Sequence, residues 1–323
     1  MRLGIYVDAR NPPAWRRPWA ELYAETLELI EEAESLGVHG VWVTEHHGFE
    51  DGYLSQPLLL AAAIAARTRH LRIGTAVLLL PLHAPRHVAE QAALIDQLSG
   101  GRLELGLGSG YLRQEFDAFG QDHEQRFATL EAGVHTLREL FADPALEPAP
   151  EQSPLPLWLG HNAAAGARRA GRLRTGLLSL DPTLAEPYLS AYEESGGRRD
   201  DARMGGVLQL VLARDPERTW SSVRPHLSAQ WDVYRSESAR SEGRPTPSPI
   251  DPDAWRTSQD GRPARFSVLT APEFLERLEQ YRGSLVSDVF VWLRVGAMPR
   301  GLVEEHLQLL ATLAPVVAEW EGS

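Results

Sequence analysis

Three titratable side chains stand together directly after an apolar run of the sequence. Glu45, His46 and His47 follow "VWV" at 41–43, a run typical of a β-strand. An imidazole titrates near neutral pH, so a positioned histidine can act as a general acid or base. Side chains alternate along an extended chain, so Glu45 and His46 would point to opposite sides and only one would face a cavity. We predict a catalytic role for His46, with a structural histidine as the alternative, and expect His47 to hydrogen-bond locally in a loop.

The sequence gives little support to other kinds of catalytic site. Side chains of a type that binds metals are Glu45, His46, His47, His83, His87 and His161. Adjacent histidines on an extended chain do not easily bind one ion, and neither HxH nor HExxH occurs, so we predict no metal site. The chain has no lysine, hence no P-loop lysine, and no GxSxG motif.

Composition restricts the class of protein further. The 323 residues include no cysteine, which excludes disulfides and thiolate chemistry, and a net charge of -12 argues against nucleic acid as a partner. No charged-then-apolar leader precedes the first strand pattern, and the longest apolar run, at 57–66, is about half the length that a bilayer crossing needs. We therefore expect a cytoplasmic protein that does not enter a membrane.

The elements that must position these side chains alternate along the chain. Apolar runs typical of strands covered on both faces lie at 3–7, 41–45, 71–80, 103–108, 155–160, 176–180, 206–213 and 289–295. Segments of helical period lie between most of them; at 20–36, for example, an apolar stripe ends at Gly37, a position suited to a left-handed cap. Eight alternations predict an α/β fold, a (β/α)8 TIM barrel formed by one domain over 1–323, with a doubly wound open sheet as the competing architecture.

Two segments interrupt this alternation. Residues 110–123 predict an irregular connection after the fourth strand, before a helix at about 124–141. Residues 239–267, rich in proline, arginine and aspartate, form an insertion between the seventh helix and the eighth strand. Loops of this length are uncommon unless they cover a site or are disordered, so we consider both a lid and a plain insertion.

In a barrel the active site lies where the strands end, which explains why a strand leads into Glu-His-His. Asp8 and Arg10 follow the first strand, and "GLGSG" at 106–110 ends the fourth; its small residues would let a ligand approach the backbone. "GHNAAAGARRAG" at 160–171 predicts a strand end followed by a helix whose first amides could hold an anion, or only an alanine-rich helix packed on the barrel.

Several of these stretches resemble the bacterial luciferase-like, flavin-dependent monooxygenases. The resemblance includes "EHH", the block "LRIGTAVLLLPLHAPRHVAEQAALIDQLSGGRLELGLGSGY" at 71–111, "EFDAFG" with Arg126 following, "PLWLGHN" and the ending "LAPVVAEW". These stretches run in order over nearly the whole chain, and the block at 71–111 is specific.

The resemblance implies a barrel that binds FMN or a deazaflavin at the end where its strands terminate, usually as a homodimer. It implies that a separate flavin reductase supplies reduced FMN, which meets dioxygen to form a C4a-peroxyflavin and oxidises a small organic substrate. His46 matches the family's catalytic histidine, and the bond between Ala76 and Val77 matches a non-prolyl cis peptide behind the flavin ring. The positions that match the cofactor site are Ala76, Val77, Gly108, Ser109, Gly110, Tyr111, His161, Asn162 and Ala163.

The chain departs from the family pattern where the flavin phosphate would lie. Many relatives have an arginine at the position of Ser109 and hydroxyl residues where 163–165 are alanine. Without the two hydrogen bonds that such an arginine makes to the phosphate, we expect the affinity for flavin to fall roughly tenfold to hundredfold, unless Arg168 or Arg169 compensates.

Two alternatives to an FMN monooxygenase remain open from the sequence. One is an oxidoreductase that transfers hydride from the deazaflavin F420 without dioxygen; the other, of a different class, is a non-catalytic flavin-binding or subunit-like paralogue. We expect Tyr53 and Trp292 to line the substrate pocket, with simple packing as the alternative.

Overall fold

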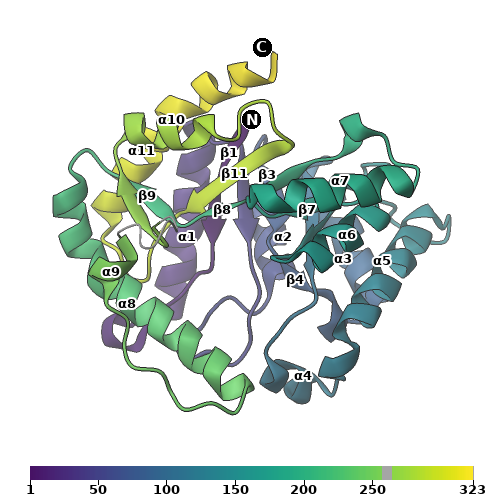
Figure 1. Cartoon of the computed structure of the whole chain (residues 1–323), viewed down its shortest axis with the longest axis horizontal. Helices are drawn as coiled ribbons and strands as arrows, with labels where there is room; N and C mark the ends of the chain where they lie inside the picture. The colour runs from purple at the N-terminus through teal and green to yellow at the C-terminus, as the bar shows by residue number, and fades with distance from the viewer. Residues whose placement is uncertain (257–263, 323) are drawn as a thin grey trace.

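A closed ring of parallel strands forms the centre of the computed structural model, which describes residues 1–256 and 264–322 (Figure 1). The strands of the ring are β1 (Arg2–Val7), β2 (Gly40–Val43), β3 (Arg72–Thr75), β4 (Leu78–Leu79), β5 (Leu103–Gly108), β6 (Leu157–Gly160), β7 (Gly176–Leu178), β8 (Met204–Leu208) and β11 (Val286–Trp292). Their hydrogen-bonded order is β3-β2-β1-β11-β8-β7-β6-β5-β4, and β3 also pairs with β5. Since β3 and β4 are consecutive segments of one apolar run, the ring has eight strand positions. The predicted (β/α)8 barrel is confirmed, and the open sheet is wrong because no edge is left unpaired.

Helices surround the ring, as the apolar stripes in the sequence predict. They are α1 (Trp19–Ser35), α2 (Pro57–Arg67), α3 (Pro85–Ser99), α4 (Arg113–Phe119), α5 (Arg126–Ala142), α6 (Ala164–Arg172), α7 (Ala185–Glu194), α8 (Pro216–Ser241), α9 (Pro252–Arg256), α10 (Ala271–Glu279) and α11 (Arg300–Ala318). The stripe of α1, including Leu29 and Ile30, is fully buried, and Gly37 after it has the expected positive φ, 88°. None of the described helices combines the length and the apolar character that a bilayer crossing requires.

The segment after the fourth strand position is more regular than predicted. Within the connection at 110–123 lies α4, a two-turn helix that ends at Gly120 in the left-handed conformation. Its apolar positions are too few to show a helical period, which is why the sequence pattern missed it. The helix carries one buried carboxylate, that of Glu115, which lies beside His46.

The insertion before the eighth strand position is also more ordered than the predicted loop at 239–267. α8 continues to Ser241, α9 follows, and β10 (Ser267–Leu269) pairs in parallel with β9 (Leu210–Leu212). Residues 257–263 of the predicted lid lie outside the described residues. Figure 1 shows α8 and α4 at the end of the ring where the strands terminate. The mouth of the barrel is therefore bordered by two helices as well as by loops.

Aromatic rings and glycines alternate in one layer of the barrel interior. Trp42 stacks on Phe290 at a centroid distance of 4.9 Å and meets Trp158 edge-on at 5.7 Å. A Cβ at Gly74 would lie 2.2 Å from Trp42, and one at Gly176 would lie 2.3 Å from Trp158. Glycine is required on these strands because the neighbouring indole rings occupy the space.

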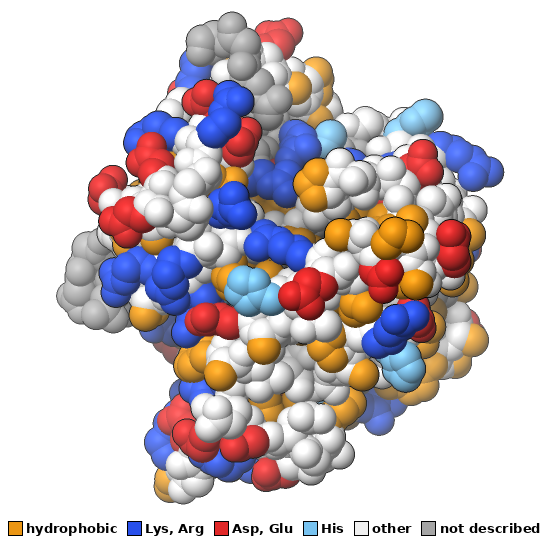
Figure 2. All heavy atoms as spheres, turned by 90° about the vertical axis from the view of Figure 1, so that its right-hand side faces the viewer, with side chains coloured by type: hydrophobic (Ala, Val, Ile, Leu, Met, Phe, Trp, Pro, Cys, Tyr) orange, Lys and Arg blue, Asp and Glu red, His pale blue; other side chains and the backbone are white. Residues whose placement is uncertain are grey.

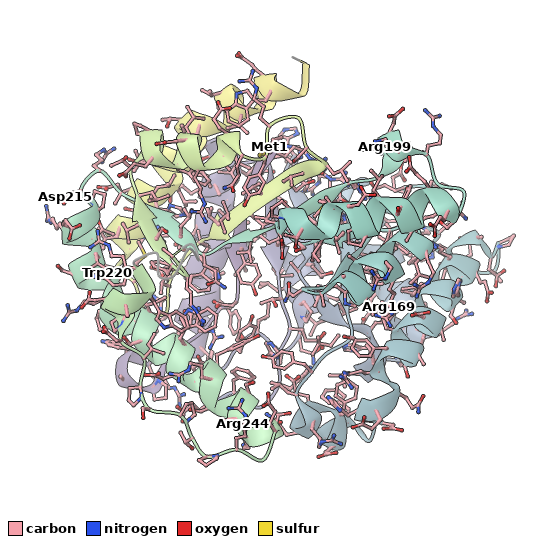
Figure 3. The ribbon with its side chains drawn as sticks, viewed as in Figure 1. Met1, Arg169, Arg199, Asp215, Trp220 and Arg244 are labelled. Atoms are coloured by element: carbon pink, nitrogen blue, oxygen red, sulfur yellow. The ribbon has the colours of Figure 1, made fainter. Side chains whose placement is uncertain are left out.

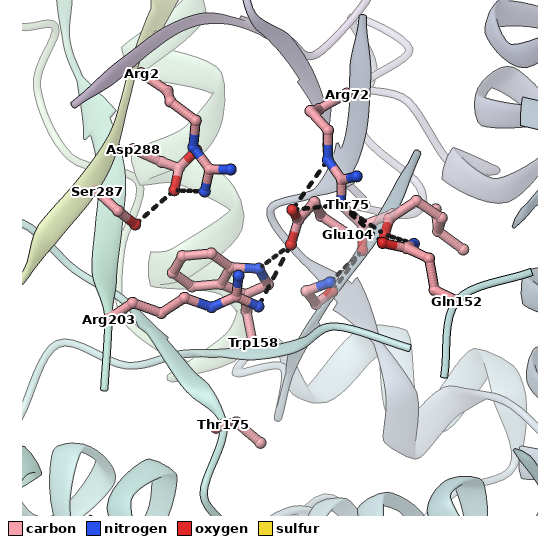
Figure 4. Close-up of polar contacts among 12 residues, drawn as sticks. Arg2, Arg72, Thr75, Glu104, Gln152, Trp158, Thr175, Arg203, Ser287 and Asp288 are labelled. Carbon is pink, nitrogen blue, oxygen red and sulfur yellow. Dashed lines mark hydrogen bonds and ion pairs between the residues drawn. The ribbon is translucent and has the colours of Figure 1, made fainter. Parts of the chain in front are cut away.

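A charged layer closes the interior at the end where the strands begin (Figure 4). Glu104, 2% exposed, accepts hydrogen bonds from Arg72 at 2.6 Å and from the Trp158 indole at 2.8 Å. Arg203 lies 3.5 Å from the same carboxylate, while Arg2 pairs with Asp288 at 2.6 Å. Burial would raise the pKa of Glu104, but Arg203 and Arg72 outweigh it and lower that pKa. This end of the barrel is thus held by paired charges.

Candidate functional site

The imidazole of His46 lies in an enclosure of four aromatic rings at the mouth of the barrel. The ring centroids of Phe49, Tyr53, Tyr111 and Tyr234 lie 4.9, 4.8, 5.6 and 5.6 Å from it. These rings come from the segment after β2, from the segment after β5 and from α8, and they leave His46 only 6% exposed. Enclosure of this kind excludes bulk water from the imidazole.

Glu115 of α4 fixes the orientation of His46. Its Oε1 lies 2.9 Å from Nδ1 of His46 and also accepts a hydrogen bond from the backbone N–H of His47 at 2.8 Å. Glu115 is 1% exposed, and its Oε2 has no partner among the described residues. A carboxylate acceptor at Nδ1 keeps the ring hydrogen there, so the lone pair of Nε2 remains to accept a proton. Glu115 lies in the stretch "EFDAFG", but the sequence pattern gave this glutamate no role, and the buried carboxylate was missed.

Glu45 lies away from the imidazole of His46 and ties the loop to the barrel. Its Oε1 contacts His47 at 2.9 Å and His83 at 2.7 Å, and its Oε2 accepts from the backbone N–H of Leu79 at 2.6 Å. Burial would raise the pKa of Glu45, but the hydrogen bonds from His47 and His83 outweigh it and lower that pKa. In the described parts of the chain, no group of three or more His, Asp or Glu side chains is arranged to hold a metal ion.

Three predicted cofactor positions meet at neighbouring strand ends. The peptide bond between Ala76 and Val77 is cis, as predicted, and both side chains are half-buried. A Cβ at Gly108 would lie 2.3 Å from Val77, and one at Gly160 would lie 2.7 Å from it. Because these two glycines, at the ends of β5 and β6, have no side chains, the side chain of Val77 can pack directly against both strands.

The predicted segment at the start of α6 carries unpartnered polar groups. Asn162 and Ala163 are exposed, and no side chain caps the helix at Ala163. His161 is buried against Gly166, and its Nε2 has no partner among the described residues. Burial, reinforced by Arg169, lowers the pKa of His161 to about 4, so its ring is neutral at pH 7.

These groups fit the phosphate end of a flavin. Uncapped first-turn amides of a helix attract anions, and a buried ring nitrogen without a partner can take a further hydrogen bond. Arg169, shown on α6 in Figure 3, points instead to Glu131 of α5, with its Nε 2.5 Å from that carboxylate. Arg168 is exposed. In this structure Arg169 is thus paired with a carboxylate, and the uncapped amides of the first turn and Nε2 of His161 are the groups here that could meet an anion.

The other predicted positions after β5 are split between two environments. Ser109 is half-buried, and its hydroxyl contacts the Gly110 carbonyl at 3.3 Å. Gly110 has a φ of 69° and lies against the ring of Phe116. Tyr111, 39% exposed, turns toward His46. The structure thus puts Tyr111 beside the imidazole, and the role predicted for Ser109 stays a prediction.

A buried set of charges lies beside the aromatic enclosure. Arg10 pairs with Asp8 at 3.0 Å and with Asp51 at 2.5 Å, and its guanidinium lies 4.1 Å from the centroid of the Tyr53 ring. Burial, only partly offset by Arg10, raises the pKa of Asp8. Gln230 of α8 donates to Asp8 at 3.2 Å, which connects α8 to the segment directly after β1.

A cavity of about 80 Å³ adjoins these charges and contains both predicted substrate residues. It is lined by Tyr6, Asp8, Arg10, Tyr53, Val207, Gln209, Gln230, Trp231, Tyr234 and Trp292. Tyr53 and Trp292 border the same space, and Tyr53 is also in contact with the ring of His46. The lining of this small cavity combines charged and amide side chains with the indole rings of Trp231 and Trp292.

Comparisons with known sequences identify relatives of this chain. The sequence model of a family described as luciferase-like monooxygenase matches residues 1–288. The chain is 40% identical over 110 residues to 4-hydroxyprotoasukamycin monooxygenase of Streptomyces nodosus subsp. asukaensis, covering 34% of this chain and 29% of that protein. It is 35% identical over 117 residues to the oxygenase component of flavin-dependent trigonelline monooxygenase of Acinetobacter baylyi, covering 36% and 32%. The matched part spans about a third of each relative.

Solved structures share the whole fold. Monooxygenase RslO1 from Streptomyces bottropensis superposes with a TM-score of 0.80 at 23% identity, covering 98% of this chain and 100% of that one. An F420-dependent secondary alcohol dehydrogenase superposes with a TM-score of 0.74 at 16% identity, covering 98% of each chain. At these identities the likeness concerns the fold.

Proposed function

The chain belongs to the luciferase-like monooxygenase family, and from that premise we propose that it is a flavin-dependent monooxygenase that uses reduced FMN and dioxygen to oxidise a small organic substrate. The observation that carries the proposal is the pairing of His46 with the buried Glu115, 2.9 Å away, inside an aromatic enclosure next to a cavity. What sets His46 apart from the histidines paired with Glu45 is its place inside the aromatic enclosure, next to Tyr53, which also lines the cavity.

The residues that would hold FMN lie at three neighbouring strand ends. Val77 and Gly108 would border its ring, and the first turn of α6 with His161 would take its phosphate. Bound reduced FMN supplies the two electrons and activates dioxygen. The protein's part is to orient the flavin, to exclude water and to place a titratable group.

His46 is the group that would move a proton. With Nδ1 committed to Glu115, its Nε2 can accept a proton from the reacting centre and return it. Tyr53 and Tyr234 pack around the imidazole and shield it from bulk water. Positioned proton transfer of this type typically contributes about 100-fold to 10,000-fold to a rate.

Two partners complete the proposal. A relative described as an oxygenase component supports a separate flavin reductase as the source of reduced FMN. A homodimer follows from the family resemblance. Sedimentation equilibrium of the purified chain, with a mass of twice 35.8 kDa expected, tests the dimer.

Binding of candidate cofactors tests the proposal most directly. The purified protein is titrated with FMN, reduced FMN and F420, and binding is followed by fluorescence quenching. We expect reduced FMN to bind, and aerobic mixing with it to produce a transient near-ultraviolet absorption band. Preferential binding of F420 would instead support hydride transfer without dioxygen, the reaction class suggested by the fold neighbour that depends on F420. Binding of none would support a non-catalytic paralogue.

A pair of histidine variants tests the role of His46. His46→Asn should slow turnover, or decay of the absorption band, at least 100-fold while reduced FMN still binds. His135→Asn, at an exposed position on α5, is the matched control and should have no effect. Unchanged turnover in the His46 variant would contradict a catalytic role.

A further inference from the structure

A second, larger cavity lies at the end of the barrel opposite the mouth. Its volume is about 840 Å³, and it is bordered by the last turns of α5 and α7, by the segment at 149–156 and by the starts of β6 and β7. Figure 3 shows Arg199, which follows α7, at the upper edge of the molecule, far from α4. The site proposed for oxidation does not extend to this end, so the cavity is not part of it.

Arginine side chains dominate the polar wall of this cavity. Arg138, Arg174, Arg198 and Arg203 border it, with Asp201 the one carboxylate among its described lining residues. Figure 2, which faces the side that carries α5, α6 and α7, shows arginine side chains, in blue, spread over that face with carboxylates, in red, between them. Four arginines around one carboxylate are a local excess of positive charge, which is unexpected in a chain of net charge -12 unless the cluster binds an anion.

Two of these arginines have no carboxylate partner among the described residues. Arg138 is half-buried, and its guanidinium donates to the carbonyl of Arg174 at 3.1 Å. Burial and the nearby charge of Arg174 lower the pKa of Arg138, which means that its positive charge is poorly compensated. Arg174 itself has a φ of 47°, a conformation that favours glycine, yet an arginine occupies it. A bound anion would offset the electrostatic cost at Arg138, and the exposed Arg174 side chain lies beside it at the edge of the cavity.

A tyrosine hydroxyl completes the polar wall. Tyr192 is 7% exposed and borders the cavity. Arg174, Arg203 and Arg138 all lie close enough to lower the pKa of Tyr192, although burial raises it overall. Arg203 is held in place by stacking on Trp158, with its guanidinium carbon 4.2 Å from the ring centroid. Three guanidinium groups and one hydroxyl donor thus surround a single region of the cavity.

Apolar side chains form another part of the wall, beside the polar Gln152, Ser153 and Thr175. Phe141, Pro150, Pro154 and Leu155 border the same cavity. A volume of this size is in the range of pockets that hold a small organic molecule. The combination of a cationic wall with a hydroxyl donor and an apolar wall therefore selects a ligand with an anionic head and an apolar body.

We propose that this cavity is a second ligand site, which binds a small organic anion through Arg138, Arg174 and the Tyr192 hydroxyl. The head group is a carboxylate or a phosphate monoester, both of which arginine binds with two parallel hydrogen bonds. The body of the ligand packs on Phe141 and Leu155. The site is independent of the flavin chemistry proposed at the mouth.

Calorimetric titration of the whole chain with phenyl phosphate, benzoate, inorganic phosphate and benzyl alcohol tests this proposal. We expect phenyl phosphate or benzoate to bind at least tenfold more tightly than inorganic phosphate, and benzyl alcohol, which lacks the charge, not to bind. The double variant Arg138→Gln/Arg174→Gln should weaken binding at least tenfold. Arg172→Gln is the matched control, because Arg172 lies two residues from Arg174 but outside the cavity, near Glu131.

Tyr192→Phe provides a second variant if the double variant does not fold, and it should also weaken binding. Far-ultraviolet circular dichroism confirms that each variant is folded. The proposal is wrong if neither aromatic anion binds, if benzyl alcohol binds as tightly as benzoate, or if folded variants bind like the unaltered chain. Equal affinities for phenyl phosphate and inorganic phosphate would also overturn it, because the apolar wall would then have no part.

Discussion

The buried imidazole of His306 should make the stability of this protein depend on pH. His306, on α11, is 0% exposed, and its Nδ1 accepts the backbone N–H of Leu212 at 2.8 Å. Burial lowers the pKa of His306 from 6.5 to about 4. The difference corresponds to about 3 kcal/mol, at about 1.4 kcal/mol for each pH unit. Between these two values the unfolded chain binds a proton that the folded chain does not, so stability falls as the pH falls from about 6.5 toward 4.

His306→Asn isolates this contribution. The asparagine carbonyl can still accept from Leu212 but does not titrate, and the smaller side chain should cost about 1–3 kcal/mol at pH 7. Urea denaturation at pH 7.5, 6.5, 5.5 and 5.0 measures the free energy of unfolding, and the variant should lose less stability on acidification than the unaltered chain, by up to about 1.4 kcal/mol per unit. His135→Asn, at an exposed position, should leave the slope unchanged. Equal slopes for His306→Asn and the unaltered chain would refute the reasoning.

Three further changes address packing and charge, each measured by urea denaturation at pH 7. Glu104→Gln should lower the free energy of unfolding by about 2–4 kcal/mol, because Arg72 would keep its charge without its carboxylate 2.6 Å away; an effect below 1 kcal/mol would contradict this. Gly176→Ala should cost about 1–3 kcal/mol, since the added methyl carbon would lie 2.3 Å from the Trp158 ring, and a neutral result would mean that the layer can shift. Thr270→Ala removes one half of a capping box and should cost about 1 kcal/mol, whereas Thr270→Ser should restore most of it.

Local patterns were sufficient to predict the barrel. A strand covered on both faces must be apolar at nearly every position, and a helix packed on a sheet must carry an apolar stripe, so both leave a periodic trace in the sequence. The runs at 3–7 and 103–108 correspond to β1 and β5 within one residue. α4 and β10 left no such trace, because they are short and α4 buries few side chains.

The candidate site was predicted in part for the same reason. His46 could be chosen because it directly follows a strand, and strand ends meet at the mouth of a barrel. Its partner Glu115 is 69 residues further along the chain, on the short helix that the pattern missed. The assignment of α8 to the rim also escaped prediction, since nothing local distinguishes it from a helix on the outside of the ring.

The sequence alone therefore determined the strand and helix alternation, the absence of thiol chemistry and the histidine at a strand end. These features depend on the composition of the chain and on the spacing of apolar residues a few positions apart, both of which can be read from the local sequence. Only the tertiary structure decided which carboxylate holds His46, which rings enclose it and which arginines face a cavity without partners. Such contacts join positions far apart in the chain, and closure of the ring alone brings them within hydrogen-bonding distance.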